Sequence, residues 1–529
     1  MSDNAEQKYI LAIDLGTSGP KVALASTNGK IIGSEFEKTE VILLTNGGAE
    51  QNPDDWWRGI KAATKRLLEK NLVPIDDIVA VNCTTQWSGT VAVDGDGNPL
   101  MNAVIWMDSR GARYIKEVTR GPINIQGYGI GKLITWLRLT GGAPGQAGKD
   151  SIAHILLIKN EFPGIYENTN KFLEPKDYLN LKLTGIYAAS YDSITLHWCT
   201  DNRDISKIVY NDRLLRMAGI AREKLPDLRP AAGILGPIKK EIAVELGLTE
   251  DVRVVMGTPD VQSAAVGSGA VKDYDGHLYI GTSSWLTCHV PFKKVDLAHS
   301  MASLPSAIPG RYFVANEQES AGACLNFIRD NIFFHPDELG VELKTPDVYK
   351  TFDEIAAKVP AGSHKLIFTP WLFGERTPVE DHSVRSGFYN MSLRTTREHL
   401  IRSVYEGVAF NSRWLLQYVE KFIKRPMGTI TMVGGGANSN IWCQIHADVL
   451  NRTIRQVKEP IRTNLRGAVF LASLALGYLK IDEIPERVPI SDTFQPNPEN
   501  REIYDDLFRE FVKIYRRNKK FFARLNKIN

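Results

Sequence analysis

The sequence predicts an α/β protein built from two similar halves, and three observations support this prediction. The chain has 529 residues, which is too long for one hydrophobic core and predicts two to four domains. Strand-like and helix-like patterns alternate along it rather than gathering in separate regions. Two stretches, YILAIDLGTSGPKVAL at 9–24 and HLYIGTSSWLTCHV at 277–290, each join two strand patterns through a Gly-Thr-Ser turn. The two hairpins therefore indicate a duplication, although so short a match is only suggestive of a repeat.

The first half alternates strands with one clear helix. The stretch PDDWWRGIKAATKRLLEK starts with a proline and two acids and then has one apolar face, so we expect a helix from about Asp54. Asn28-Gly29 is a typical hairpin turn. The predicted strands are Tyr9–Leu15, Lys21–Ala25, Lys30–Gly33, Ile78–Thr84 and Thr90–Val93.

The second half repeats this scheme. We expect strands at Tyr279–Gly281 and Ile430–Val433, and a helix near Ser320–Asn331. Further helices are expected after Gly436 and Asn464. A glycine-rich helix end gives way to a polar turn near 267–276, which places the boundary between a first domain, 1–270, and a second domain, 271–529.

Composition excludes several classes of protein. The hydrophobic fraction of 43% and charged fraction of 24% are typical of a globular protein, and a net charge of +3 gives no argument for nucleic acid or a membrane as partner. The N-terminal MSDNAEQK has no apolar signal region, and the longest apolar stretch, GAVFLASLALGYL, is too short to span a bilayer. Five widely spaced cysteines indicate reduced thiols in a cytoplasmic enzyme and offer no zinc site: Cys83, Cys199, Cys288, Cys324 and Cys443.

The Gly-Thr-Ser turns are candidate phosphate-binding loops. Glycine there admits unusual backbone angles and leaves N–H groups and hydroxyls open to a ligand. One such turn alone is usually only a turn, but two of them, one beside Asp14, indicate phosphates held from two sides. The established nucleotide motifs are absent: GYGIGKL lacks the spacing and the Ser or Thr of a Walker A loop, and no GxGxxG follows a strand.

Two further stretches place glycines or an acid at the end of a strand. In MVGGGANSNIWCQIHADVL a strand leads through three glycines into a helix, which suits a flat ligand on bare backbone or simply a tight turn. In VVMGTPDVQSAAVGSGA a buried strand leaves Asp260 at its carboxyl end, where ligands of α/β proteins gather. A structural helix N-cap explains an aspartate there equally well.

Taken together, these stretches resemble the FGGY family of carbohydrate kinases, and within it most of all the xylulokinases. The resemblance runs from about Ile10 to Phe511, and its motifs are specific as a set rather than singly. It implies the duplicated actin-like, ribonuclease H-like ATPase fold, with two domains around a central cleft and ATP between them. The motifs are, in family order, IDLGTSG, EQNPDDWW, TTQWSGTVAVD, WMDSR, LEPKDYLNLKLTG, MGTPD, IGTSS, SGFYNMSLRTTREHLIRSVYEG and GGGANSNIWCQIHADVL.

The chain departs from the family pattern at three places. Asn390 stands where the family usually has a glycine, and the signature around Lys132 and Trp136 carries one extra residue. MGTPD replaces the more common three-glycine lead into the catalytic aspartate. These differences concern local loop geometry.

The resemblance also implies roles for single residues. Asp260 is the expected general base, which takes the proton from the sugar hydroxyl, and Asp14 is the expected ligand of Mg²⁺. The residues expected to bind ATP are Thr17, Ser18, Lys21, Gly281, Thr282, Gly322, Asn326, Gly435, Gly436 and Ser439. Those expected to bind the sugar are Gln86, Trp87, Ser88, Asp108, Arg110 and Asp260.

The acceptor is the least determined part of this interpretation. Glycerol kinases have Gln-Arg-Glu and xylulokinases Gln-Met-His where this chain has Gln86-Trp87-Ser88. Trp87 suits the C–H face of a sugar, and ordinary core packing explains it equally well. The expected reaction is D-xylulose to D-xylulose 5-phosphate, with ribulose, gluconate and, less favoured, glycerol as alternatives.

A different class of function is a non-catalytic actin-like regulator that binds sugar or ATP. Retention of Asp14, both Gly-Thr-Ser turns and Asp260 argues against it, because a pure binder needs no base. The expected partner is a small-molecule sugar, with neither nucleic acid nor membrane, and a homodimer is left open.

Overall fold

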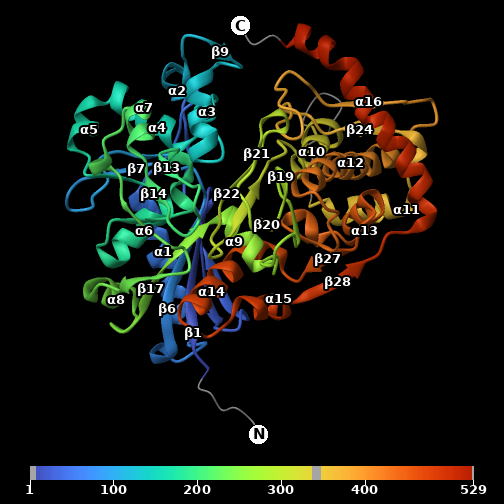
Figure 1. Cartoon of the computed structure of the whole chain (residues 1–529). Helices are drawn as coiled ribbons and strands as arrows, with labels where there is room; N and C mark the ends of the chain where they lie inside the picture. The colour runs from blue at the N-terminus through green and yellow to red at the C-terminus, as the bar shows by residue number, and fades with distance from the viewer. Residues whose placement is uncertain (1–6, 336–346, 527–529) are drawn as a thin grey trace.

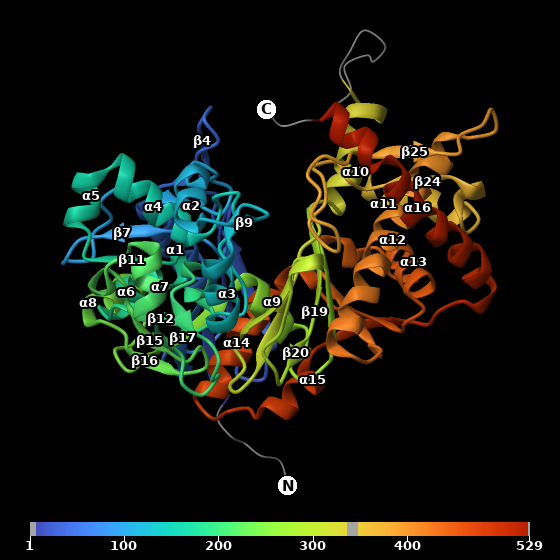
Figure 2. The ribbon, with the colours of Figure 1, turned by 45° about the horizontal axis from the view of Figure 1, so that its top comes forward.

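The computed structural model describes residues 7–335 and 347–526, which form two α/β lobes (Figure 1). Each lobe has its own central sheet, and the lobes stand side by side, joined along one end by helices α9 (Asp260–Gly267) and α14 (Thr463–Ala475) (Figure 2). Most of the polar N-terminal segment lies outside the described residues. No helix within the described ranges is long and apolar enough to cross a membrane.

The first lobe is built on a six-stranded mixed sheet. Strand β1 pairs antiparallel with β2 through the first Gly-Thr-Ser hairpin and parallel with β6, which in turn pairs parallel with β17. The sheet order is β16 (Ile234–Pro237), β17 (Arg253–Pro259), β6 (Ile78–Thr85), β1 (Tyr9–Gly16), β2 (Gly19–Ser26) and β3 (Ile31–Phe36).

The second lobe repeats this pattern in a five-stranded sheet. Strand β18 pairs antiparallel with β19 through the second Gly-Thr-Ser hairpin and parallel with β26. The order is β19 (Ser284–Thr287), β18 (Gly276–Ile280), β26 (Ile430–Val433), β27 (Ile454–Val457) and β28 (Ile490–Phe494). Both sheets thus contain a Gly-Thr-Ser hairpin, as the two sequence repeats predict, and the first strand of each hairpin also pairs with a parallel strand from later in the chain.

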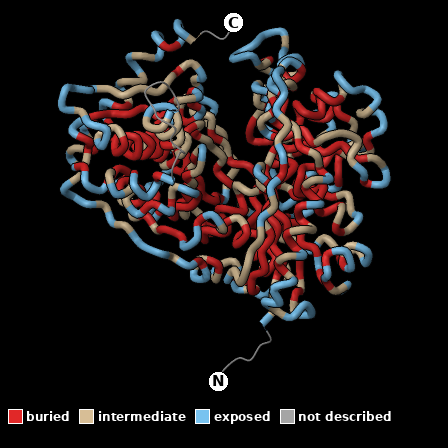
Figure 3. Tube along the Cα trace, turned by 180° about the vertical axis from the view of Figure 1, so that it is seen from behind, coloured by how far each residue is buried: buried red, intermediate tan, exposed pale blue. Residues whose placement is uncertain are grey.

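Helices and smaller sheets complete the lobes. Helix α1 starts behind Asn52, whose side chain accepts the N–H of Asp54, and it packs on β2 and β3. Buried residues fill the interior of each lobe and the junction between them (Figure 3). The other helices used below are α1 (Pro53–Leu68), α3 (Ile130–Leu139), α6 (Pro175–Thr184), α10 (Gly322–Ile328), α11 (Tyr349–Lys358), α12 (Arg397–Ile423), α13 (Asn440–Leu450) and α16 (Arg501–Leu525).

The helices at the junction are exchanged between the lobes. Helix α14 follows the second sheet in sequence, yet its Leu465 and Val469 pack on Ile10 and Ala80 of the first sheet. Conversely, Val266 of α9 packs in a core with strands of the second sheet. The sequence boundary near 270 stays a prediction, because the cores interlock across it.

Most predicted elements are confirmed to within two residues, and two of them differ in form. The helix expected near 320–331 is α10, which ends at Ile328 and continues as one π-helical segment, Arg329–Phe333. The helix expected after Gly436 starts only at Asn440, because a short 3₁₀ turn first occupies Gly435–Asn438.

Asn390 adopts a left-handed backbone conformation with φ of 70°, and its side-chain Nδ2 donates to the Lys365 carbonyl at 3.0 Å. Among side-chain-bearing residues asparagine tolerates this conformation best, which explains how it replaces the glycine of the family motif.

Candidate functional site

Asp14 lies near the end of β1 and is 2% exposed. Lys21 stands opposite it on β2, with Nζ 3.6 Å from Asp14 Oδ2. Burial raises the pKa of Asp14, while the Lys21 charge and the nearby Asn464 side chain of α14 lower it. Within the described residues, Oδ1 of Asp14 has no hydrogen-bond partner of ordinary length. The described part of the chain therefore contains a buried carboxylate oxygen without a partner, which is uncommon in folded proteins and indicates a group that a bound ion or ligand would satisfy.

Asp260 is the first residue of α9, directly after the carboxyl end of β17. Burial, reinforced by the negative charge of Asp14, raises the pKa of Asp260 to about 7, and Lys21 opposes the shift. Its Oδ1 accepts the N–H of Val261 at 2.8 Å. Pro259 occupies the N-cap position and Asp260 the first position of the helix, where its carboxylate accepts a first-turn N–H, so a structural role at the helix start stays an alternative.

Tyr279 on β18 is a residue of the second lobe that lies near Asp14 and Asp260. Its ring stacks on Trp285, with centroids 3.9 Å apart and planes 4° apart. Burial and the charges of Asp260 and Asp14 raise the pKa of Tyr279 to about 12. A Cβ on Gly281 would lie 2.4 Å from this ring, so the second hairpin requires a glycine there. Sequence reasoning assigned no role to Tyr279, although it stands two residues before Gly281 in the second hairpin, and none to Asn464, which belongs to no motif.

Thr17 at the tip of the first hairpin is tied to the segment expected to bind sugar. Its hydroxyl donates to Gln86 Oε1 at 3.0 Å and accepts the indole N–H of Trp106 at 3.0 Å. Gln86 in turn donates to Gln51 Oε1 at 2.7 Å, and Gln51 returns a bond to the Thr17 carbonyl at 2.9 Å. The predicted phosphate and sugar segments are thus joined, and Ser18 beside them is exposed.

Asp108 and Arg110 form a closed charge network. Arg110 Nε donates to Asp108 Oδ2 at 2.9 Å, and its Nη2 donates to Asp108 Oδ2 and Glu50 Oε1, each at 2.6 Å. The fully buried Asp108 carboxylate also accepts the N–H of Ala49 at 2.9 Å. The guanidinium is thus already neutralised by two carboxylates.

Trp87 and Ser88 are held by the backbone of their own lobe. The half-buried indole of Trp87 donates to the Ser193 carbonyl at 3.0 Å and packs against an apolar core. Ser88 has φ of 60°, and its hydroxyl donates to the Lys149 carbonyl at 2.6 Å. Packing explains part of the Trp87 surface, and the rest is open.

The second hairpin is joined to α10 by backbone hydrogen bonds. Gly322 N–H donates to the Gly281 carbonyl at 2.7 Å, and Ala321 N–H donates to the Thr282 carbonyl at 2.8 Å. A Cβ on Gly322 would lie 2.6 Å from the Gly281 oxygen. Asn326, one turn along α10, accepts a hydrogen bond from Tyr349 of α11.

The remaining predicted ATP residues surround the start of α13. Gly435 is exposed, and no atom lies within 4 Å of the point where a Cβ would stand, whereas Gly436 is covered by Ile280 and Trp442. Ser439 caps α13 by accepting the Trp442 N–H at 3.1 Å and donates to Asp353 at 2.7 Å. The exposed backbone of Gly435 is the surface on which a flat ring fits best.

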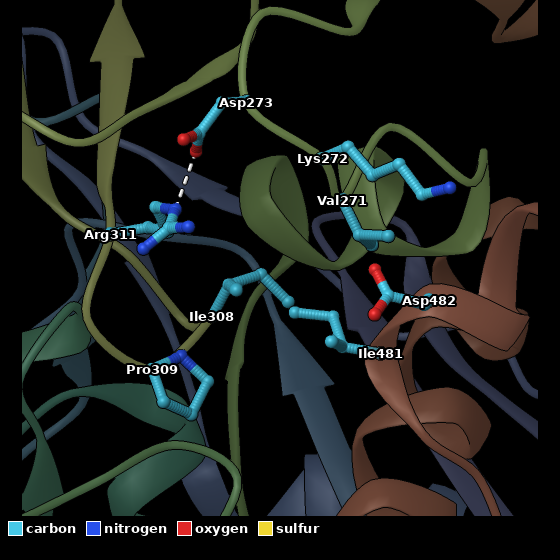
Figure 4. A pocket seen from close by; sticks show the side chains of 8 residues that line it. All are labelled: Val271, Lys272, Asp273, Ile308, Pro309, Arg311, Ile481 and Asp482. Atoms are coloured by element: carbon cyan, nitrogen blue, oxygen red, sulfur yellow. Dashed lines mark hydrogen bonds and ion pairs between the residues drawn. The ribbon is translucent and has the colours of Figure 1, made fainter.

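The structure thus brings Asp14, Lys21 and Asp260 together with Tyr279 at the lobe junction. A surface pocket of about 340 Å³ lies elsewhere (Figure 4). It contains none of the predicted site residues, and its Arg311 is paired with Asp273. The residues lining it are Val271, Lys272, Asp273, Ile308, Pro309, Arg311, Ile481 and Asp482.

Two family domains match most of the chain. The N-terminal domain of the FGGY family of carbohydrate kinases matches residues 9–267, and the C-terminal domain matches 277–476. The chain belongs to the FGGY family of carbohydrate kinases. It is a sugar kinase, as its motifs predict.

Similar proteins in the family act on different sugars. A xylulose kinase of Staphylococcus epidermidis is 27% identical over 98% of this chain and 99% of its own length. A gluconokinase of Bacillus subtilis is 25% identical over 96% of each chain.

Solved structures agree on the fold. Those of a gluconate kinase and a ligand-bound xylulose kinase, both from Lactobacillus acidophilus, superpose with TM-scores of 0.85 and 0.84. Each is 24% identical and covers 98% of this chain and 100% of its own. At this identity the likeness shows the two-domain FGGY kinase fold alone.

Proposed function

We propose that this sugar kinase transfers the γ-phosphoryl group of ATP to D-xylulose, giving D-xylulose 5-phosphate and ADP. The names of several similar proteins support a ketopentose as the acceptor. The five cysteines are all buried and unpaired, which fits a reducing cytoplasm as its location.

Asp260 is the proposed general base, and its raised pKa is the observation that carries the mechanism. A carboxylate with a pKa of about 7 is half deprotonated at neutral pH and holds a proton far better than an exposed aspartate. It would accept the proton of the attacking hydroxyl as that oxygen bonds to phosphorus. Phosphoryl transfer otherwise needs alignment and charge stabilisation, which the two hairpins would supply.

The two Gly-Thr-Ser hairpins would hold the phosphates from opposite lobes. Lys21 and the Thr17–Ser18 turn would act from the first lobe, and Gly281 with Thr282 from the second. The adenosine would lie on the exposed backbone at Gly435, near α10 and α13.

Asp14 fits Mg²⁺ as a single-carboxylate ligand. Its buried Oδ1 lacks a hydrogen-bond partner within the described part of the chain, and carboxylate oxygen is a preferred donor for this ion. The described residues contain no group of three His, Cys, Asp or Glu side chains suited to a metal. A Mg²⁺ ion that keeps most of its hydration shell and shares ATP phosphates needs no such group. When bound it would neutralise charge on the phosphates.

The charge network at Arg110 favours a ketose over a sugar acid. Among the residues predicted to contact the acceptor, Arg110 carries the only full positive charge, and Asp108 and Glu50 already pair with it. A gluconate carboxylate would have to displace one of them. The missing Arg-Glu pair beside Gln86 disfavours glycerol in the same way, because a small triol then lacks charged partners.

One assay tests this proposal. ATP consumption is measured with D-xylulose, D-ribulose, D-gluconate and glycerol, and the phosphorylated carbon of each product is located by ³¹P–¹H NMR. D-Xylulose should give the highest kcat/KM and a 5-phosphate. A higher kcat/KM for gluconate or glycerol would refute the substrate, and no ATP consumption with any acceptor would refute the assignment of the site.

A further inference from the structure

The strand that carries Asp260 has a bulge directly before it. Val255 pairs with Asn82 of β6 and Thr258 pairs with Thr84, so two residues of β17 face one residue of β6. Gly257 within the bulge has φ of 72°, and a Cβ there would lie 2.2 Å from a β6 carbonyl oxygen. This irregularity sets the direction in which β17 enters α9.

Two side chains of α6 donate hydrogen bonds to the backbone of the bulge. The carbonyl of Met256 accepts hydrogen bonds from Lys176 Nζ at 3.0 Å and from Asn180 Nδ2 at 2.7 Å. Both donors are completely buried. They take the place of the sheet partner that the bulge removes from the Met256 carbonyl, while the N–H groups of Met256 and Gly257 donate to the carbonyls of Gly233 and Ala231.

Burying the Lys176 ammonium costs more free energy than burying a neutral donor that could also bind the Met256 carbonyl. This ammonium is 0% exposed and is compensated by the equally buried Asp177. Apolar residues in place of a buried ion pair often stabilise a protein, so fold stability alone does not account for a charge here. An ammonium does offer three donors, which can hold Asp177 and Met256 at fixed directions together.

A second buried acid holds the strand two residues before the base. Thr258 donates its hydroxyl to Asp192, which is completely buried. Asp192 is followed by Ser193, whose hydroxyl donates to Asp177 Oδ2 at 2.9 Å and whose carbonyl accepts the indole N–H of Trp87. The contacts thus run without a break from Trp87 to the segment that ends at Asp260.

We propose that Lys176 is a positioning residue for catalysis: through Met256, and together with Asp192 through Thr258, it fixes Asp260 relative to the acceptor. This inference rests on the proposed role of Asp260 as the base. A base must lie within hydrogen-bond distance of the proton it takes, and misplacement by about 1 Å can reduce a rate about 100-fold. Buried contacts to strand β17, which leads into Asp260, can hold the carboxylate in place to within such a distance.

The first test compares two substitutions at one contact. Thr258→Val removes the hydroxyl that Asp192 accepts and keeps the side-chain shape, whereas Thr258→Ser keeps the hydroxyl. We expect kcat to fall about 10- to 100-fold in Thr258→Val, with KM for ATP nearly unchanged, and to recover to within about threefold of wild type in Thr258→Ser. Equal kcat values for the two variants would contradict the proposal.

The second test removes the charge. The pair Lys176→Met/Asp177→Asn removes both members of the ion pair, leaves the neighbouring buried acids Asp192 and Glu174 in place, and should lower kcat without a matching rise in KM for ATP. The control is Arg402→Met/Glu406→Gln, which removes a similarly buried ion pair on α12, remote from β17. The control should lose thermal stability while its folded fraction keeps the wild-type kcat. A normal kcat in the Lys176 double variant, or an equal loss in the control, would overturn the inference.

Hydrogen exchange separates failure of this inference from failure of the proposed function. Amides of residues 253–260 should exchange faster in the Lys176 double variant than in wild type, whether or not a sugar is phosphorylated. If wild type phosphorylates no sugar, the proposed function fails alone. If exchange in this peptide is unchanged, the positioning role fails alone.

Discussion

Lys21 lies directly across the β1–β2 hairpin from Asp14, and its Nζ is 3.6 Å from the carboxylate. The carboxylate is buried, but the lysine side chain is 41% exposed, so the charge points out of the sheet as well as toward its partner. Because the lysine end of the pair is in contact with solvent, the attraction between the two charges is partly screened. The position of Lys21 suits a cation that meets phosphate oxygens beside Asp14, the carboxylate proposed to bind Mg²⁺.

Replacement of Lys21 should therefore affect ATP more than stability. Lys21→Met is expected to raise KM for ATP and lower kcat, because the developing phosphate charge loses one positive partner. The melting temperature should change by no more than a few degrees, and Lys21→Arg should retain part of the activity. Steady-state kinetics with ATP varied at saturating sugar measures this, and an unchanged KM and kcat in Lys21→Met would remove Lys21 from the nucleotide site.

Substitution of Asp260 separates catalysis from binding. Asp260→Asn keeps the shape and removes the proposed base, so kcat should fall roughly 10²- to 10⁴-fold with little change in sugar affinity. Sugar affinity can be followed by isothermal titration calorimetry, which does not depend on turnover. Wild-type turnover in this variant would show that another group takes the proton.

The pH dependence of activity and stability should have opposite signs. Because the Asp260 pKa is raised to about 7, kcat/KM should rise with pH through about 7 as the base loses its proton. A raised carboxyl pKa in the folded state means that the ionised form is disfavoured there, so this group reduces the free energy of unfolding as pH rises from about 4 to above 7.

Thermal melts measure the predicted effect of Asp260 ionisation on stability. Asp260→Asn should melt above wild type at pH 8 and together with it below pH 4, because only the ionised carboxylate is disfavoured by burial and repelled by Asp14. Melting curves that keep the same difference at both pH values would show that ionisation of Asp260 is not the cause.

Local sequence patterns were sufficient for the hairpins and insufficient for the junction. Strand β1 is apolar on both faces and ends at an acid and a glycine turn, so its limits are visible in the sequence. Helix α14 is apolar on nearly all its faces. Such a pattern predicts that a helix is buried, but it does not indicate which sheet the helix packs against. The exchange of α9 and α14 between lobes was therefore not predictable.

The site was predicted only where a motif carries chemistry. Asp14 and Asp260 stand in recognisable motifs, and the structure brings them into electrostatic contact. Tyr279 lies in the second hairpin motif, but its approach to these two acids, like that of Asn464 to Asp14, depends on how the two lobes pack together. Lys176 stands in the LEPKDYLNLKLTG motif, but its contact with Met256 depends on a bulge that the sequence does not show.

Trp87 should contribute to acceptor binding through the part of its ring that the core does not cover. Trp87→Ala is expected to raise KM for D-xylulose more than it lowers kcat, and to lower the melting temperature, because truncation of a buried aromatic costs about 3–5 kcal/mol in a core and less at a half-open site. Trp87→Phe removes the hydrogen bond to Ser193 and part of the ring surface but keeps an aromatic face, so it should keep more of the affinity than Trp87→Ala. A fall in melting temperature with KM unchanged in Trp87→Ala would assign the residue to packing alone.

Gly467 should be intolerant of the smallest substitution, because α14 and α9 touch there through their backbones. A Cβ on Gly467 would lie 1.9 Å from the Ser263 carbonyl oxygen, and one on Gly267 would lie 2.0 Å from the Thr463 oxygen. Within an exposed helix, Gly→Ala ordinarily stabilises by about 0.5–1 kcal/mol. Here the overlap with backbone must outweigh that gain, since neither carbonyl can move without separating the helices. Gly467→Ala should therefore lower the melting temperature.

The matched control is Gly131→Ala, on the exposed side of α3 with no atom near the added methyl group, which should leave the melting temperature unchanged or raise it. Because α9 begins at Asp260, a Gly467→Ala protein that remains folded should also lose kcat, and Gly131→Ala should not. If Gly467→Ala melts at or above the temperature of Gly131→Ala, the two helices do not meet at the distance seen here.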